Sequence, residues 1–197
     1  MFSGIVAALG RITCLTPREA GLRLTVDAGR LGLDDVAFGD SIAHNGVCLT
    51  VVGKEDGQFM VDVSPETLSC TVGLDALGPV NLEKALRLND VIGGHLVSGH
   101  VDGVGEVLRF DPVGDNRLLE IRAPAALAKY IARKGSITVD GVSLTTNEVN
   151  GAAFTINLIP HTLENTTLNR LTPGARVNLE VDLIARYVER MLDAERR

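Results

Sequence analysis

The feature that most constrains this chain is a segment that occurs twice. Residues 41–52 read SIAHNGVCLTVV and residues 136–147 read SITVDGVSLTTN, so six of twelve letters agree at an offset of 95 positions. The pair Ser3-Gly4 recurs at the same offset as Ser98-Gly99. Such self-similarity indicates one structural unit that is present twice, head to tail. A doubled unit predicts two similar pockets, and the function should therefore need both.

Two further matches carry the repeat through each half. FMVDVSPETL at 59–68 returns as FTINLIPHTL at 154–163, and VNLE at 80–83 returns at 177–180, two residues late. Each unit of about 95 residues is long enough to hold a modest hydrophobic core. We therefore expect three parts in the 197-residue chain: a first barrel over 1–94, a second barrel over 95–183 and a helix over 184–197.

Short alternating segments separated by turn residues are typical of β-strands. Asn45-Gly46 and Asp140-Gly141 are the dipeptides of type I′ hairpin turns, in which both residues take a positive φ. Six or so strands per half predict a small antiparallel barrel. We predict an all-β fold of two tandem six-stranded antiparallel Greek-key barrels related by the internal repeat, plus a C-terminal α-helix. First strands are expected over 2–12 and 96–108, and a helix over 124–133.

The tail has no counterpart in the first half. Apolar residues at helical spacing predict one apolar stripe, formed by Ile184, Tyr187, Val188, Met191 and Leu192. The helix either packs on its own barrel or associates subunits. The second interpretation gains weight because the predicted barrels need no additional element.

Composition excludes several classes of function. The net charge of −6 leaves no basic surface for nucleic acid, and no apolar run approaches the length of a membrane span. The three cysteines are odd in number and do not recur in the second half, which indicates reduced thiols in a cytoplasmic protein. Nucleotide-binding glycine motifs and a nucleophile elbow are absent. His95 and His100 lack partners at zinc spacing, so we expect no metal.

Positions that agree between the halves are those that the barrel or a shared ligand requires, whereas positions that differ indicate where two similar molecules meet different fates. The differing pairs are Cys48 and Ser143, Ile5 and His100, Phe2 and Val97, Asp182 and Ala85, and His44-Asn45 against Val139-Asp140. Each difference also has a purely structural interpretation. Cys48 can be a small core residue, His100 a strand-edge histidine, and Asp182 the cap of the tail helix.

Long motifs in order along nearly the whole chain carry a resemblance to a known family. They are MFSGIV, GDSIAHNGVCLT, SPETL, VNLE, GGHLVSGHVDG, KGSITVDGVSLT, LIPHTLENTTL and NLEVDLIARYVERML. Together they resemble the riboflavin synthases of the trimeric, two-barrel kind. Ser3 stands where the family commonly has threonine, and it keeps the hydroxyl.

The resemblance implies an enzyme that transfers a four-carbon unit between two molecules of 6,7-dimethyl-8-ribityllumazine. The products are riboflavin and 5-amino-6-(ribitylamino)uracil, so the enzyme is a transferase with one lumazine-binding barrel for each molecule. It implies no cofactor and no metal, a homotrimer formed through the C-terminal helix, and an active site between the first barrel of one subunit and the second barrel of a neighbour. The alternatives are a non-catalytic, antenna-type protein that binds lumazine or flavin, and a structural barrel without a ligand. The enzyme is favoured because Phe2, Ser41, Cys48 and His100 are all in place.

The same resemblance implies roles for individual residues. His100 would shuttle the proton of the acidic C7 methyl group, and Ser41, Cys48 or a water held by them would add to the acceptor. The predicted catalytic set is Ser41, Cys48, His100, Asp182, Phe2 and Thr145. The predicted pocket walls are Gly4, Ile5, Val6, Cys48, Leu49, Thr50, Asp62, Val63, Ser64, Pro65, Glu66, Thr67, Gly99, His100, Val101, Lys134, Ser143, Leu144, Thr145, Leu158, Ile159, Pro160, His161, Thr162 and Leu163.

Overall fold

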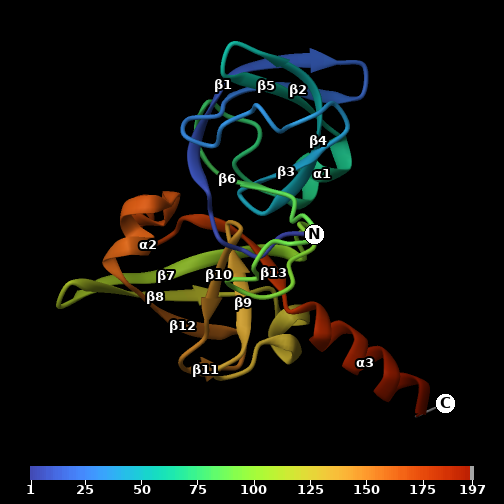
Figure 1. The fold of residues 1–197 in the computed structure, drawn as a ribbon. Coiled ribbons are helices and arrows are strands. Elements are labelled where there is room, and N and C mark those ends of the chain that lie inside the picture. The colour runs from blue at the N-terminus through green and yellow to red at the C-terminus, as the bar shows by residue number, and fades with distance from the viewer. Residues whose placement is uncertain (196–197) are drawn as a thin grey trace.

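The computed structural model describes residues 1–195, which form two β-rich halves and a C-terminal helix (Figure 1). In the first half six antiparallel strands close into a barrel in the order β1-β2-β5-β4-β3-β6. The elements are β1 (Ala8–Arg18), β2 (Gly21–Asp27), β3 (Ser41–His44), β4 (Val47–Glu55), β5 (Gln58–Val63), α1 (Pro65–Cys70) and β6 (Gly78–Lys84).

The second half repeats this order in a curled sheet of seven strands, β10-β9-β13-β7-β8-β12-β11. Its elements are β7 (Gly103–Val113), β8 (Asn116–Arg122), the 3-10 helix η1 (Ala125–Tyr130), β9 (Ser136–Val139), β10 (Val142–Thr145), β11 (Val149–Asn150), β12 (Ala153–Leu158), α2 (Pro160–Asn165), the 3-10 helix η2 (Thr167–Arg170) and β13 (Arg176–Val181). The all-β class is thus confirmed, with one strand more than predicted in this half.

The additional strand arises because the counterpart of β4 is divided. Thr146 lies between β10 and β11, at the position that Val51 holds in the first half. Val51 belongs to the first core, whereas the buried Thr146 donates its hydroxyl to the backbone carbonyl of Ala132. A buried hydroxyl needs such a partner, and the strand is interrupted where Thr146 makes it.

The predicted first strands begin too early. β1 starts at Ala8 rather than Phe2, and β7 at Gly103 rather than Leu96. The preceding residues form two extended segments, which we call the first arm (residues 2–7) and the second arm (residues 97–102). Gly4 (φ 76°) and Gly99 (φ 80°) take left-handed backbone conformations, and these conformations prevent a regular strand from running through the arms.

Helical segments also differ from the prediction. The helix expected over 124–133 is the shorter η1, and the short helices α1 and α2 were not predicted. Both α1 and α2 have proline in their first turn. Proline suits this position because its missing N–H would have no helical partner there.

Both predicted type I′ turns are present, and they touch each other. Asn45, Gly46, Asp140 and Gly141 all have positive φ, at 46°, 83°, 47° and 78°. A Cβ atom on Gly46 would lie 2.8 Å from the backbone nitrogen of Gly141. Only glycine therefore fits at either turn, and the two hairpins fix the halves against each other.

A pseudo-symmetric set of hydrogen bonds surrounds these turns. The amides of Asn81 and Asn178 donate to the side chains of Asn45 and Asp140, each at 2.8 Å. The Asn81 side chain donates to the Asp140 carbonyl (2.9 Å), and the Asn178 side chain to the Asn45 carbonyl (3.1 Å). The asparagine of each VNLE motif thus joins one half to the other.

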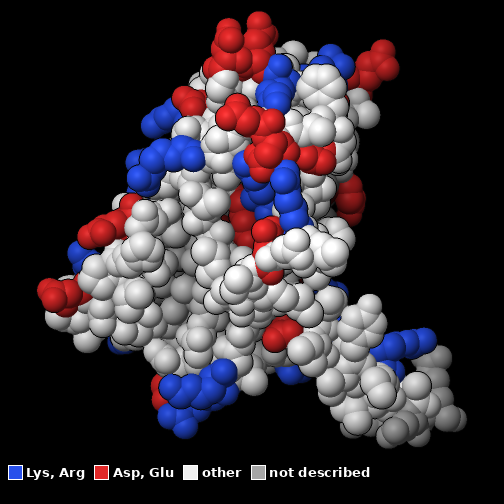
Figure 2. Space-filling model, viewed as in Figure 1, with Lys and Arg blue, Asp and Glu red and all other residues white. Residues whose placement is uncertain are grey.

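The C-terminal helix α3 (Leu183–Glu195) projects from the second half (Figure 1), and residues 196–197 of the predicted tail lie outside the described residues. Its five stripe residues are 50–68% exposed, so the stripe does not pack on its own barrel. Figure 2 shows a largely uncharged face on this helix. Glu189 ties α3 to η1 through Lys129 and Tyr130. Within the described residues, no helix combines the length and apolar character needed to cross a membrane.

Candidate active site

The two arms cross between the halves. The carbonyl of Gly4 in the first arm accepts a hydrogen bond from the Ser143 amide of the second half (2.7 Å). The carbonyl of Gly99 in the second arm accepts one from the Cys48 amide of the first half (2.8 Å). Each candidate site is therefore built from the strands of one half and the arm of the other. Because of this crossing, His100 of the second arm belongs to the site on the first barrel, although it lies in the second half of the sequence.

The glutamate of each VNLE motif holds an arm in place. Glu83 accepts from the amide and hydroxyl of Ser3 (2.7 and 2.8 Å) and from the Gly4 amide (3.0 Å). Glu180 holds Ser98 (2.6 and 2.6 Å) and Gly99 (3.0 Å) in the same way. Burial raises the pKa of Glu83, and the hydrogen bonds from Ser3 oppose this shift. The sequence reasoning missed both residues, although their identity in the two halves was a usable signal.

The first site brings four predicted catalytic residues to one region. Phe2 is fully buried in a small cluster against which Cys48 packs. A Cβ atom on Gly99 would lie 2.7 Å from Cβ of Cys48 and 2.8 Å from Cε2 of Phe2, so the arm that carries His100 runs directly over both. Ser41 on β3 is paired in register with Thr50 on β4.

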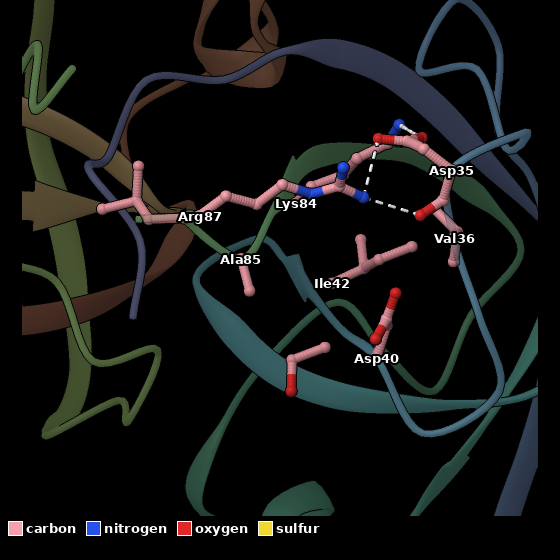
Figure 3. Close-up of a pocket in the computed structure, with 9 residues that line it drawn as sticks. Asp35, Val36, Asp40, Ile42, Lys84, Ala85 and Arg87 are labelled. Carbon is pink, nitrogen blue, oxygen red and sulfur yellow. Dashed lines mark hydrogen bonds and ion pairs between the residues drawn. The ribbon is translucent and has the colours of Figure 1, made fainter. Parts of the chain in front are cut away.

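A small hollow lies beside Ser41 (Figure 3), with a volume of about 150 Å³. Asp35 closes one side through ion pairs with Lys84 (2.5 Å) and Arg87 (3.0 Å). The Lys84 hydrogen bond lowers the pKa of the Asp35 carboxyl. Pockets for small molecules usually measure roughly 300–1,000 Å³. At about 150 Å³ this hollow is smaller than that range.

The second site centres on a pair that the sequence reasoning missed. Nδ1 of His95 lies 2.7 Å from Oγ of Ser143. The other ring nitrogen of His95 is buried and has no hydrogen-bond partner among the described residues. Burial lowers the pKa of His95, while the charges of Asp182 and Glu180 raise it. A neutral imidazole beside a hydroxyl can accept a proton. His95 had been considered only as a metal ligand.

The glycines that precede His95 let the connecting segment pass over this site. A Cβ atom on Gly94 would lie 2.6 Å from Cβ of Ser143, and one on Gly93 would lie 3.1 Å from Ile5. Val6 of the same arm packs against the second core. The close approach requires glycine at Gly94, where a Cβ atom would also lie 2.2 Å from the Ser3 carbonyl oxygen, and the glycine pair in GGHL is the signal that could have identified the site.

The remaining catalytic candidates belong to the second half. Asp182 accepts a hydrogen bond from the Ile184 amide (2.9 Å), so it caps α3, as its structural interpretation predicts, and its charge also acts on His95. Thr145 is exposed at the end of β10. Lys134 has φ 66°, where its counterpart Gly39 has φ 92°. A lysine in the left-handed region is strained, and such strain gathers at functional sites.

The other predicted wall residues divide into two groups. Leu49, Val63 and Leu158 point into the two cores, so only their backbone can face a ligand. Residues 64–67 and 159–163 form the segments that begin α1 and α2, and they are half-buried or exposed. Asp62 is ion-paired with Arg23 (2.7 Å), which lowers the pKa of its carboxyl. Val101 packs on the first core. Residues 1–195 hold no group of three or more His, Cys, Asp or Glu residues that could bind a metal ion.

Comparison with known proteins explains the doubled site. The model of the lumazine binding domain matches this chain twice, over residues 3–85 and 98–182. The riboflavin synthase of Photobacterium phosphoreum is 46% identical over 194 residues, covering 98% of this chain and 89% of that protein. The chain belongs to the riboflavin synthase family. The riboflavin synthase of Mycobacterium bovis is also 46% identical, over 199 residues and 98% of both chains.

Solved structures of another protein, LumP, share the fold of this chain. Crystal structures of LumP complexed with riboflavin and with 6,7-dimethyl-8-(1'-D-ribityl) lumazine superpose with TM-scores of 0.83 and 0.82. Their identities are 28% and 26%, and each covers 92% of this chain and 99% of LumP. The first matched domain ends at residue 85, directly after β6, and the second ends at residue 182, directly after β13.

Proposed function

We propose that the protein acts as a transferase on two molecules of 6,7-dimethyl-8-ribityllumazine. A four-carbon unit passes from one to the other, which gives riboflavin and 5-amino-6-(ribitylamino)uracil. The observation that carries this proposal is the pair of crossed-arm sites. They share one scaffold, yet the first presents Cys48 with the arm of His100 and the second presents Ser143 bonded to His95. One compound used in two roles needs such a pair.

Each site offers one imidazole and one nucleophilic side chain. The C7 methyl group of the lumazine is acidic because its carbanion delocalises into the ring, so an imidazole suffices as a base. His95, bonded to Ser143, and the exposed His100 are the two bases. Cys48, Ser41 or a water between them adds to the acceptor. Holding two flat rings face to face contributes up to about 7–11 kcal/mol of effective molarity.

The active site is shared between subunits of a homotrimer in this proposal. The small hollow at Ser41 and the uncovered stripe of α3 both support it, because each leaves surface that a second copy can cover. Residues 1–94 and 95–183 would be the two lumazine-binding domains, and residues 184–197 the assembly helix. We place the reaction in the cytoplasm, where the three thiols stay reduced.

The decisive experiment mixes the purified protein with the lumazine, without added metal or nucleotide, and follows riboflavin absorbance. We expect two molecules of lumazine to disappear for each riboflavin formed. His100→Ala is the matched control and should turn over far more slowly. Tight binding of the lumazine without any riboflavin would instead support the antenna-type alternative.

A further inference from the structure

We propose that Asp102, paired with Arg186 of α3, is a positioning residue that fixes the second arm and thereby places His100. The inference rests on the role given to His100 in the proposed function. It identifies a connection from the C-terminal helix, through one buried carboxylate, to the first site. Neither Asp102 nor Arg186 is among the predicted catalytic or wall residues.

Asp102 joins three segments of the chain. Its amide donates to the Leu179 carbonyl (2.8 Å), and Oδ2 of its carboxylate accepts from the Val181 amide (2.8 Å). Oδ1 of the same carboxylate forms an ion pair with Arg186. The Asp102 side chain is only 5% exposed, against 44% for Arg186. A single carboxylate therefore connects the second arm, the end of β13 and the first turns of α3.

These contacts determine where His100 can lie. His100 is exposed, so its position follows from the backbone on either side of it. Upstream, Gly99 is held between Glu180 (3.0 Å) and the Cys48 amide (2.8 Å). Downstream, Val101 packs on the first core, and Asp102 is held by its hydrogen bonds and its ion pair. Without the Asp102 carboxylate, the arm would keep one backbone hydrogen bond at this end and lose its two side-chain contacts.

Comparison of the two halves shows that the barrel does not need a carboxylate at the position of Asp102. The counterpart of Asp102 in the first arm is Ala7, whose amide donates to Leu82 (2.9 Å) as the Asp102 amide donates to Leu179. The backbone bond thus belongs to both barrels, whereas the acidic side chain occurs only in the half that a long helix follows. Burying the Asp102 carboxylate costs desolvation energy. The need to fix the second arm explains why the carboxylate is nevertheless present.

Arg186 lies at an unfavourable place in α3, and its charge interacts with Glu189 in the same helix as well as with Asp102 of the second arm. It is the fourth residue of α3, near the helix N-terminus, where the macrodipole disfavours a cation. The partner Asp102 compensates for this placement. Glu189 makes the other described ion pair of α3, but it reaches Lys129 in η1 and no residue of either arm. Glu189 is therefore the matched control for helix attachment without arm attachment.

The kinetic test compares Asp102→Ala, Asp102→Asn, Arg186→Lys and Glu189→Gln. We expect Asp102→Ala to lower kcat for the lumazine about tenfold with KM changed less than about twofold. Asp102→Asn should lose less, because its amide oxygen still accepts from Val181. Arg186→Lys should keep most of the parent's activity, because it retains the positive charge beside Asp102. Glu189→Gln should match the parent. Unchanged kcat in Asp102→Ala, or an equal loss in Glu189→Gln, would overturn the proposal.

A second readout does not need the reaction. The Cys48 amide exchanges with deuterium only when its bond to Gly99 opens, so its exchange rate, measured by NMR, reports on the arm. We expect exchange about tenfold faster in Asp102→Ala and unchanged in Glu189→Gln. If the parent forms no riboflavin yet this difference appears, the proposed function fails and the arm contact stands. If the parent is active and neither readout moves, Asp102 has no positioning role.

Discussion

The two halves of this chain differ most where they are otherwise most alike, at the hairpins that join them. In the first half the turn is preceded by His44, which is buried against Phe59 with ring centroids 5.3 Å apart. In the second half the same position is the fully buried Val139. The ionisable residue of the second half comes one position later, as Asp140 in place of Asn45. At the junction of the two hairpins, the first half therefore buries His44 and the second half buries Asp140.

The two groups respond to pH in opposite directions. Burial lowers the pKa of His44 to about 4, so protonation favours unfolding as the pH falls below 6.5. Burial raises the pKa of Asp140 to about 7, so ionisation favours unfolding as the pH rises. The comparison teaches that the shared residues set the scaffold, whereas the differing residues His44 and Asp140 set how each half responds to protons.

Removal of α3 should have the largest effect, because it deletes both the exposed apolar stripe and Arg186, the partner of Asp102 in the second arm. Truncation after Asp182 deletes the exposed stripe. We expect monomers by sedimentation, unchanged barrel signals in circular dichroism, and turnover lower by about a thousandfold or more, since the active site that we propose between subunits would lose one wall.

Ligand binding to the first barrel of the truncated chain is the internal control and should persist. A truncated chain that remains trimeric would contradict the assembly role of α3, and a monomer with full activity would place the chemistry within a single subunit.

Asp140→Asn makes the second junction residue match Asn45, and it should reverse a pH trend. The folded pKa of about 7 lies above the unfolded value of 3.8, so the parent loses free energy of unfolding as the pH rises between them. We expect the parent to lose about 3 kcal/mol between pH 5 and pH 8 relative to the variant. Urea denaturation at both pH values measures this difference.

His44 is common to parent and variant, so its opposite trend cancels in that comparison. Asn fits the site because Asn45 makes the equivalent hydrogen bond to Asn81 (2.8 Å). Parallel pH dependences in the two proteins would show that Asp140 is already ionised in the folded state.

Cys48→Ser makes the first site resemble the second, and it should have the smallest effect of the three. Serine fills nearly the same volume but is a weaker nucleophile than cysteine. We expect kcat about tenfold lower and a KM within about twofold of the parent. Steady-state kinetics with the lumazine measure both. Cys14→Ser, at an exposed thiol, is the control, and parent-like turnover in Cys48→Ser would make Cys48 a packing residue only.

Much of the fold was predictable because its signals are local or internal to the repeat. The I′ dipeptides at Asn45-Gly46 and Asp140-Gly141 determine their turns, and the apolar stripe after Asp182 determines a helix. The arms were not predictable in this way. The segment from Phe2 onward is predicted as a strand, but the left-handed Gly4 interrupts it, and the Gly4 carbonyl bonds to Ser143, a partner far away in the sequence.

The sequence predicted which residues belong to the candidate site, but not how they pair. The differing pairs of the repeat identified Cys48, His100, Phe2 and Asp182, and the resemblance assigned their roles and added most of the pocket walls. The pairing of His95 with Ser143 depends on how the connecting segment folds back over the second half, which no local pattern encodes. Glu83 and Glu180 could have been found by asking which acidic residues the repeat preserves, because a buried carboxylate needs several donors.

The crossing of the arms has a consequence for the order in which the chain folds during synthesis. The strands of the first barrel are complete once β6 ends at Lys84, yet the first arm still lacks its partner at Ser143. Asn178 and Asn45 at the junction are 133 positions apart. A growing chain therefore carries a closed barrel with an undocked, partly apolar arm until most of the second half has left the ribosome, and contacts of such long separation form late.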